Sequence, residues 1–213
     1  IGIVFPELLV RQFLVTTTYL FACSLIATGG LQVFFTRFVS DRLFEKKPHV
    51  ILPNLLGIML IATVGAGLLA FVLLWWLFDE PFLYRLLVLT NFVTLCNLWL
   101  VIIFLSGMKQ YNRILLTMLG GYSLMVVSSF FLRPWGLNGL LFALLIGHGT
   151  LLFVFLFDIL REYRADKLIA FDFLQRKQVF LSLLVTGICY NMGIWADKFI
   201  FWFNPMTSEQ VIG

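Results

Sequence analysis

The sequence has few charged residues. Only 12% of its 213 residues are Asp, Glu, Lys or Arg, whereas 61% are hydrophobic. A water-soluble domain has about 25% charged residues, so this composition excludes that class. The formal net charge of +4 is typical of basic cytoplasmic loops in a membrane protein. We therefore expect a membrane protein in contact with lipids, with no nucleic-acid partner.

Residues that perform catalysis or bind metals are also scarce. The chain has two histidines and three cysteines. Cys23, Cys96 and Cys189 fall inside hydrophobic runs and lack metal-binding or CxxC spacing. The sequence contains no HExxH, no GxSxG, no glycine-rich phosphate loop and no pair of carboxylates in the middle of a span. These absences predict a protein that is not an enzyme and that holds no metal or cofactor.

Long hydrophobic runs predict an all-α fold, a polytopic bundle of membrane helices. Each run is long enough to cross about 30 Å of hydrocarbon at about 1.5 Å per residue. Pro6 and Glu7 suit the start of the first helix, and Glu7 and Arg11 have the spacing of an ion pair within a helix. The six runs cover about residues 7–35, 51–78, 82–105, 113–132, 137–157 and 178–203.

The basic residues between the runs predict the orientation in the membrane. Lys and Arg accumulate in cytoplasmic loops. Eleven of them lie in three alternate segments, 37–50, 106–113 and 158–177: Arg37, Arg42, Lys46, Lys47, Lys109, Arg113, Arg161, Arg164, Lys167, Arg176 and Lys177. Four lie on the opposite side: Arg11, Arg85, Arg133 and Lys198. The three segments are therefore predicted to be cytoplasmic.

The segment 161–177 mixes charges with apolar side chains such as Leu168, Phe171 and Phe173. This mixture suits an amphipathic helix at the cytoplasmic interface that links two helical lobes. An ordinary connecting loop with basic residues explains it equally well. Both interpretations stay open at this point.

Polar residues inside the spans are candidates for a substrate pathway. Helix packing also uses small and hydroxyl residues, so packing and a water-filled cavity compete as explanations. A cavity of amides and hydroxyls with few charges would suit a neutral, polyhydroxylated substrate. The candidates are Gln12, Thr16, Tyr19, Asn91, Thr94, Asn97, His148, Tyr190, Asn191, Asp197 and Lys198.

The sixth run carries two charges, Asp197 and Lys198. A charge at the centre of a membrane helix costs about 2.5–3.5 kcal/mol, so such residues usually have a function. Neighbours on a helix point about 100° apart, so we do not expect these two to pair with each other. Helical spacing gives two adjacent lines that favour contact with protein or water: Thr186, Tyr190, Gly193 and Asp197, and Gly187, Asn191, Ile194 and Lys198.

His148 and the tryptophans each allow two interpretations. His148 suits a proton relay or, as we favour, a neutral histidine bonded to a neighbouring helix. Most tryptophans map to the outer half of the membrane, where they form either the usual aromatic belt or a surface on which exported sugar rings stack. These exit-side aromatics are Trp75, Trp76, Trp135, Trp195 and Trp202.

Two stretches carry a family resemblance: Thr36–Lys47, after a polar first span, and Trp195–Phe203. They resemble the inner-membrane transporters of the Pel exopolysaccharide system, within the MOP (multidrug/oligosaccharidyl-lipid/polysaccharide) flippase superfamily. The resemblance implies about twelve helices in two lobes, with one helix before residue 1. Residues 1–160 would form most of the N-terminal lobe, 161–177 the inter-lobe linker and 178–213 the first helix of the C-terminal lobe.

The resemblance also implies a function. It implies export of an N-acetylgalactosamine-rich polymer across the bacterial inner membrane, in a complex with the Pel D and E membrane proteins and a cytoplasmic glycosyltransferase. Two alternatives remain: a cation-coupled drug exporter of the same superfamily, and a non-transporting scaffold of a polysaccharide synthase complex.

Overall fold

The computed structural model describes residues 6–107, 111–163, 167–175 and 181–204, and all regular structure in them is helical. This confirms the all-α prediction. The long helices are α1 (Glu7–Phe44), α2 (Ile51–Leu77), α3 (Phe82–Gly107), α4 (Tyr111–Phe131), α5 (Gly136–Glu162) and α6 (Leu181–Phe203). Three short 3₁₀ helices join them: η1 (Pro48–Val50), η2 (Arg133–Trp135) and η3 (Asp172–Leu174).

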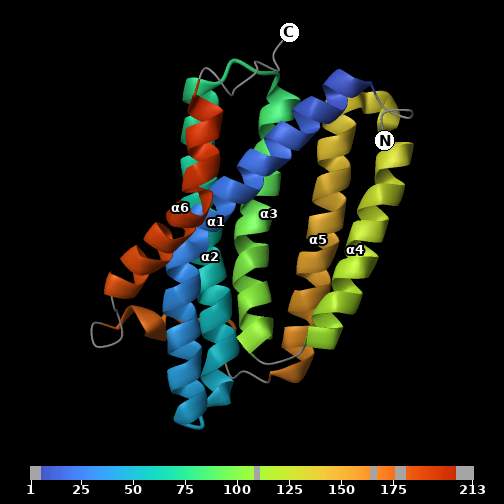
Figure 1. Ribbon diagram of the computed structural model, residues 1–213. Coiled ribbons are helices and arrows are strands. Elements are labelled where there is room, and N and C mark those ends of the chain that lie inside the picture. The colour runs from blue at the N-terminus through green and yellow to red at the C-terminus, as the bar shows by residue number, and fades with distance from the viewer. Residues whose placement is uncertain (1–5, 108–110, 164–166, 176–180, 205–213) are drawn as a thin grey trace.

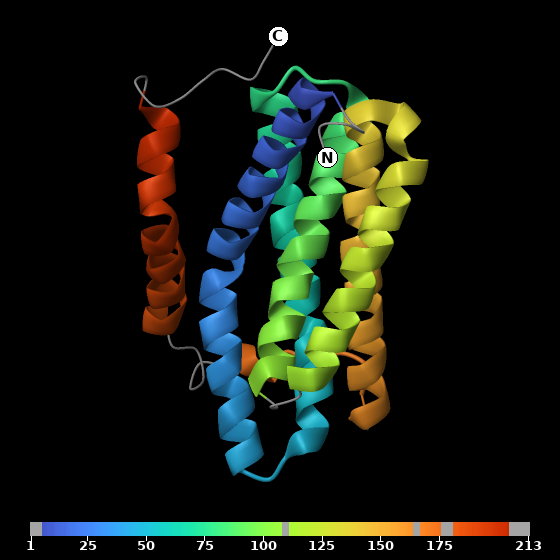
Figure 2. The ribbon, with the colours of Figure 1, turned by 45° about the vertical axis from the view of Figure 1, so that its right-hand side comes forward.

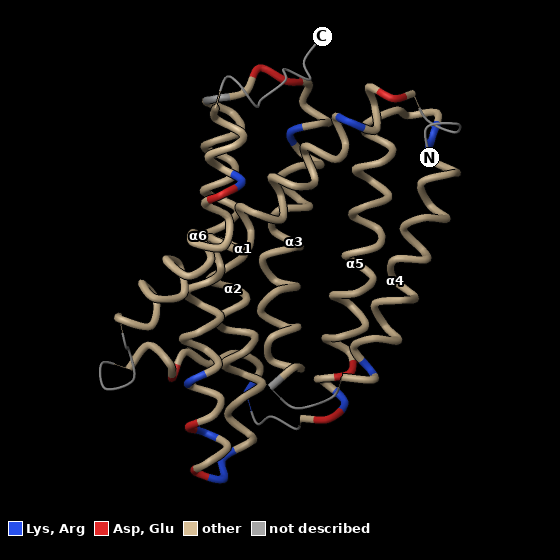
Figure 3. Tube along the Cα trace, in the orientation of Figure 1, with Lys and Arg blue, Asp and Glu red and all other residues tan. Residues whose placement is uncertain are grey.

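Five of the helices in the described part of the chain, α1 to α5, are long and apolar enough to cross a membrane. Charged residues gather at the two ends of this bundle and leave its middle almost free of charge (Figure 3). The protein is therefore a multi-pass membrane protein. The predicted sixth helix exists, but Asn191, Asp197 and Lys198 lower its hydropathy and it does not meet the same criterion. That α6 spans the membrane remains a prediction.

Two helices are longer than predicted. The first was expected to end near Phe35, yet α1 continues to Phe44. Phe38 and Val39 are buried, and Arg37 pairs with Asp41 at 3.0 Å one turn further on, so packing and charge both extend the helix. Most of the stretch 36–47 is thus helical rather than a loop.

The fifth helix likewise continues to Glu162 instead of ending near Phe157. Ile159 in this extension is buried. Arg113 at the start of α4 lies 3.8 Å from Asp158 and 3.5 Å from Glu162. These ion pairs fasten the adjacent ends of α4 and α5. The predicted pair of Glu7 and Arg11 is confirmed at 2.8 Å.

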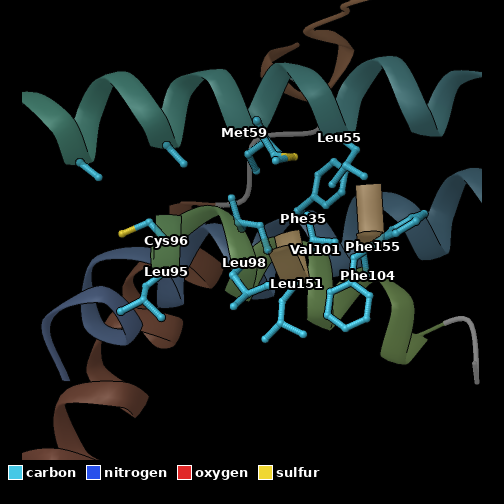
Figure 4. Packing of buried hydrophobic residues seen from close by; sticks show 14 of the residues in the cluster. Phe35, Leu55, Met59, Leu95, Cys96, Leu98, Val101, Phe104, Leu151 and Phe155 are labelled. Carbon is cyan, nitrogen blue, oxygen red and sulfur yellow. The ribbon is translucent and has the colours of Figure 1, made fainter. Parts of the chain in front are cut away.

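Helix α3 lies at the centre of the bundle and packs against α1, α2 and α5, while α4 covers α5 (Figure 1). The core is apolar. Leu98 and Val101 of α3 meet Leu55 of α2 and Leu151 and Phe155 of α5 (Figure 4). Helix α6 stands at the edge of the molecule beside α1, on the side away from α4 (Figure 2). Helices α4 and α6 flank this core and pack against it with partly buried residues such as Met118 and Leu184.

Residues 167–175 contain the single turn η3 rather than a continuous amphipathic helix. Arg164, Arg176, Lys177, Gln178 and the loop residue Lys109 lie outside the described residues. Phe173 is 1% exposed because its ring lies among aromatic rings of α1. Its neighbours are Phe34, Phe35 and Phe38, with ring centroids at 6.1, 6.4 and 6.1 Å.

Three hydrogen bonds hold the same segment against the start of α2. Asn54 donates to the Asp172 carboxylate at 3.0 Å and accepts from the Asp172 main-chain N–H at 2.8 Å. The Ala170 N–H donates to the Pro53 carbonyl oxygen at 3.0 Å. We call residues 170–174 the docked segment. It lies at the end of the bundle that the loop charges predict to be cytoplasmic.

Candidate functional site

Asn91 and Asn97 of α3 lie inside the bundle and bond to neighbouring helices. Asn91 is fully buried; its amide donates to the carbonyl oxygens of Leu87, at 2.8 Å, and of Leu141 on α5, at 3.0 Å. Asn97 is also buried and donates to the hydroxyl of Thr63 on α2 at 2.8 Å. These bonds join α3 to α5 and to α2, as packing amides do in membrane bundles. Thr94 between them is half-buried.

His148 of α5 is buried, with 1% of its surface exposed. Its Nδ1 lies 3.0 Å from the carbonyl oxygen of Leu144. The prediction of a bond to a neighbouring helix was therefore wrong, because the ring turns back onto its own helix. The neighbouring helices contribute aromatic rings instead: Phe21 of α1 and Tyr122 of α4 meet the imidazole edge-on, with centroids at 5.6 and 5.9 Å. Neither ring supplies the carboxylate that a proton relay would use.

A buried column of polar side chains on α1 escaped the sequence analysis. Ser24, Thr28 and Gln32 are each buried and follow one another at i, i+4 spacing. Trp99 of α3 donates its indole N–H to the Ser24 hydroxyl at 2.9 Å, and Gln32 donates to the Thr28 hydroxyl at 2.8 Å. The column joins α1 to α3. The spacing of the three residues was the signal that would have revealed it.

At the outer end of α1 the candidates lie nearer the surface. The Thr16 hydroxyl lies 3.1 Å from the Tyr84 hydroxyl of α3, so Thr16 helps to hold those two helices together. Gln12 is half-buried. Tyr19 is exposed and faces α6, where its ring meets Trp202.

Helix α6 crosses α1 with the two backbones in close contact. A Cβ atom added to Gly29 would lie 2.6 Å from the Gly187 carbonyl oxygen, and one added to Gly30 would lie 2.6 Å from that of Leu184. Real Cβ atoms do not approach backbone atoms so closely. Any side chain at these positions would therefore separate the helices. Asn191 also faces this crossing, with its amide donating to the Gly187 carbonyl oxygen at 3.2 Å.

Four aromatic side chains meet where α1 and α6 run together near their outer ends. Trp202 of α6 is central: its ring centroid lies 4.5 Å from Tyr19 of α1, 5.3 Å from Phe199 and 6.2 Å from Trp195. The three α6 residues share one face of the helix, since they are spaced at i, i+4 and i+7. They are half-buried. We call these four residues the α1–α6 aromatic cluster.

The other exit-side tryptophans do not join this cluster. Trp75 packs on Phe71, at 4.6 Å between centroids, beneath the guanidinium of Arg85. Trp76 is 88% exposed, as expected of an aromatic-belt residue. Trp135 is also exposed and meets only Phe142 among the described rings.

The two polar lines predicted on α6 have different surroundings. Gly187 and Asn191 of the second line lie against α1. The first line is exposed: Tyr190 is 67% exposed, and open space surrounds Gly193. Thr186 and Asp197 are exposed as well. We call Thr186, Tyr190, Gly193 and Asp197 the open face of α6.

Asp197 and Lys198 do contact each other, contrary to the prediction. The Lys198 ammonium lies 3.3 Å from the Asp197 carboxylate. The two positions point about 100° apart, but the lysine side chain is long enough to span that angle. The same ammonium lies 5.4 Å from the centre of the Trp195 ring. Both charged groups are exposed, and the ammonium lies at the edge of the aromatic cluster.

A small cavity lies at the opposite end, between the docked segment and the start of α2. Its volume is about 240 Å³. His49, Val50 and Pro53 form one wall, and Lys167, Ala170 and Asp172 form the other. Among the described residues no three His, Cys, Asp or Glu side chains gather in a way that would hold a metal ion.

These observations define a class: a multi-pass helical membrane protein with a packed bundle of apolar helices and a further helix, α6, that packs on α1 and exposes polar groups. A family model described as "PelG: Putative exopolysaccharide Exporter (EPS-E)" matches residues 2–213. The chain therefore belongs to the PelG family of exopolysaccharide exporters, which is not an enzyme family. This confirms the predicted resemblance to the transporters of the Pel exopolysaccharide system; membership of the MOP superfamily stays a prediction. No curated protein and no solved structure matches the chain.

Proposed function

We propose that this protein exports a neutral, N-acetylgalactosamine-rich polysaccharide across the bacterial inner membrane, along a polar route between two helical lobes. The family supplies the substrate class, since its members are described as exopolysaccharide exporters. The observation that carries the route is the open face of α6. If α6 spans the membrane, its exposed face carries a tyrosine and a carboxylate. Such a face is more stable against water or protein than against lipid.

The interior of the α1–α5 bundle is less suited to the route. Leu95, Leu98 and Val101 fill its centre, and the amides of Asn91 and Asn97 donate to neighbouring helices. A polymer passing there would have to displace this core. We therefore assign Asn91, Asn97 and His148 to packing. The pathway candidates that we retain are Gln12, Tyr19, Tyr190, Asp197 and Lys198.

In this proposal α6 begins the C-terminal lobe and lines the route with its open face, and the N-terminal lobe supplies the other wall. In this proposal residues 1–160 form most of the N-terminal lobe, and the docked segment belongs to the linker that joins the lobes. Rocking of two lobes about a shared site is the usual transporter mechanism. A long polymer must also slide, so the route needs weak, repeated contacts. The Pel D and E proteins and a cytoplasmic glycosyltransferase would deliver the growing polymer.

The test is polymer export in cells that lack the endogenous gene and carry the full-length protein. We expect Tyr190→Leu and Asp197→Asn to lower extracellular polymer severalfold while membrane abundance stays constant. Met192→Leu is the matched control, because Met192 is exposed on α6 outside the open face. Normal export by both open-face variants would overturn the proposed route. Normal export by cells without the protein would overturn the proposed function.

A further inference from the structure

The arrangement of the α1–α6 aromatic cluster differs from that of an aromatic belt. Trp76 projects from α2 with 88% of its surface exposed, as suits a residue of the aromatic belt. Trp195 and Trp202 instead lie half-buried on one face of α6, with centroids 6.2 Å apart. Tyr19 of α1 continues the row at 4.5 Å from Trp202. The chain thus builds a row of rings across two helices.

The Lys198 ammonium lies beside this row, and it links the row to Asp197 on the neighbouring face of α6. Lys198 places its ammonium 5.4 Å from the centre of the Trp195 ring and 3.3 Å from the Asp197 carboxylate. Both groups are exposed, so each has hydrogen-bonding capacity for a further partner. Lys198 supplies donors and Asp197 supplies acceptors. Aromatic faces and exposed hydrogen-bonding groups therefore occur together at one place.

A sugar ring needs this combination of groups. One face of a pyranose is a sheet of C–H bonds, which carry positive partial charge, whereas an aromatic face carries negative partial charge. The hydroxyl and acetamido groups at the edge of the sugar need donors and acceptors. A polymer offers a similar pyranose ring at every repeat, so a row of aromatic rings can bind successive repeats as the chain advances.

We propose that the α1–α6 aromatic cluster is a sugar-stacking site at the outer end of the export route, with Trp195 as the principal ring and Lys198 as its hydrogen-bonding partner. This inference rests on the proposed function and names the groups that contact the polymer. The ligand is a stretch of neutral polysaccharide that stacks through its pyranose rings. Lys198 leaves the Trp195 face when a sugar occupies it and bonds to the sugar edge.

Two substitutions of Trp195 test the role of the aromatic ring separately from that of apolar bulk. Trp195→Phe keeps an aromatic face, whereas Trp195→Leu keeps an apolar side chain without one. Trp76→Leu is the control for a tryptophan at the interface. The full-length protein is placed in lipid nanodiscs and titrated with N-acetylgalactosamine oligosaccharides. Saturation-transfer NMR of the sugar protons measures the binding. Thermal unfolding of each variant checks that it is folded.

We expect Trp195→Leu to weaken binding about tenfold, the effect of one stacked ring. Trp195→Phe should stay within about threefold of the wild type, and Trp76→Leu should match it. Equal binding by Trp195→Leu and Trp195→Phe would overturn the inference, as would an equal loss in Trp76→Leu or no binding by the wild type.

Export measurements separate failure of this inference from failure of the proposed function. If the wild type restores export to the deletion strain and Trp195→Leu does so equally well, the stacking site is wrong and the exporter assignment stands. If the wild type does not restore export, the exporter assignment fails. The comparison of the two Trp195 variants in nanodiscs then still decides whether the cluster binds sugar.

Discussion

Removing the Phe173 side chain should release the docked segment from the helical bundle. Phe173 is 1% exposed and its ring meets Phe34, Phe35 and Phe38. Replacing a buried phenylalanine by alanine costs about 3–5 kcal/mol. The hydrogen bonds between the segment and residues Asn54 and Pro53 remain, and each contributes about 1 kcal/mol. Phe173→Ala should therefore lower the docking equilibrium constant by about 10²–10³.

Phe171 provides a matched control, two residues away in the same segment. It is 42% exposed, so Phe171→Ala removes a half-solvated ring and should cost about 1–2 kcal/mol. Both substitutions make the same chemical change. The structure predicts that their effects on the docking equilibrium constant differ by at least about fivefold.

Hydrogen exchange measures the docking directly. The Ala170 and Asp172 amides donate to Pro53 and Asn54, so both exchange only when the segment undocks. We expect Phe173→Ala to accelerate their exchange about 10²–10³-fold, and Phe171→Ala by about tenfold. Amides in α3 serve as the internal reference and should not change. Equal acceleration in the two variants, or none in Phe173→Ala, would refute the reasoning.

Four further predictions concern α6 and the bundle. Gly187→Leu should separate α6 from α1 and abolish export, whereas Gly193→Leu, which meets open space, should leave the two helices together; cross-linking between cysteines placed on α1 and α6 distinguishes the two outcomes. A double-mutant cycle of Asn97→Ala and Thr63→Val should give a coupling of about 0.6 kcal/mol in thermal unfolding, and no coupling would contradict the bond between them. Tyr190→Leu and Asp197→Asn should lower polymer export severalfold, and Met192→Leu should not, as secreted polymer would show. Trp195→Leu should bind oligosaccharide about tenfold more weakly than the wild type and Trp195→Phe should not, as the NMR titration would show.

Length, composition and local patterning were enough to predict that this is a helical membrane protein and where its helices lie. In lipid each helix must satisfy its own backbone hydrogen bonds, so a run of apolar residues specifies a helix without reference to the rest of the chain. The predicted starts at Glu7, Ile51 and Phe82 agree with the structure. The extensions of α1 and α5 were missed because tertiary packing of Phe38 and Ile159 stabilises them.

Only the tertiary structure separated the packing residues from the accessible ones. Asn91 and Tyr190 are both polar residues within hydrophobic runs, and nothing in their local sequence distinguishes them. One lies between α3 and α5, and the other is exposed on α6. The docked segment depends on Asn54 and Asp172, which are 118 residues apart. A side chain's environment is set by which helices meet around it, and local periodicity contains no information about that meeting.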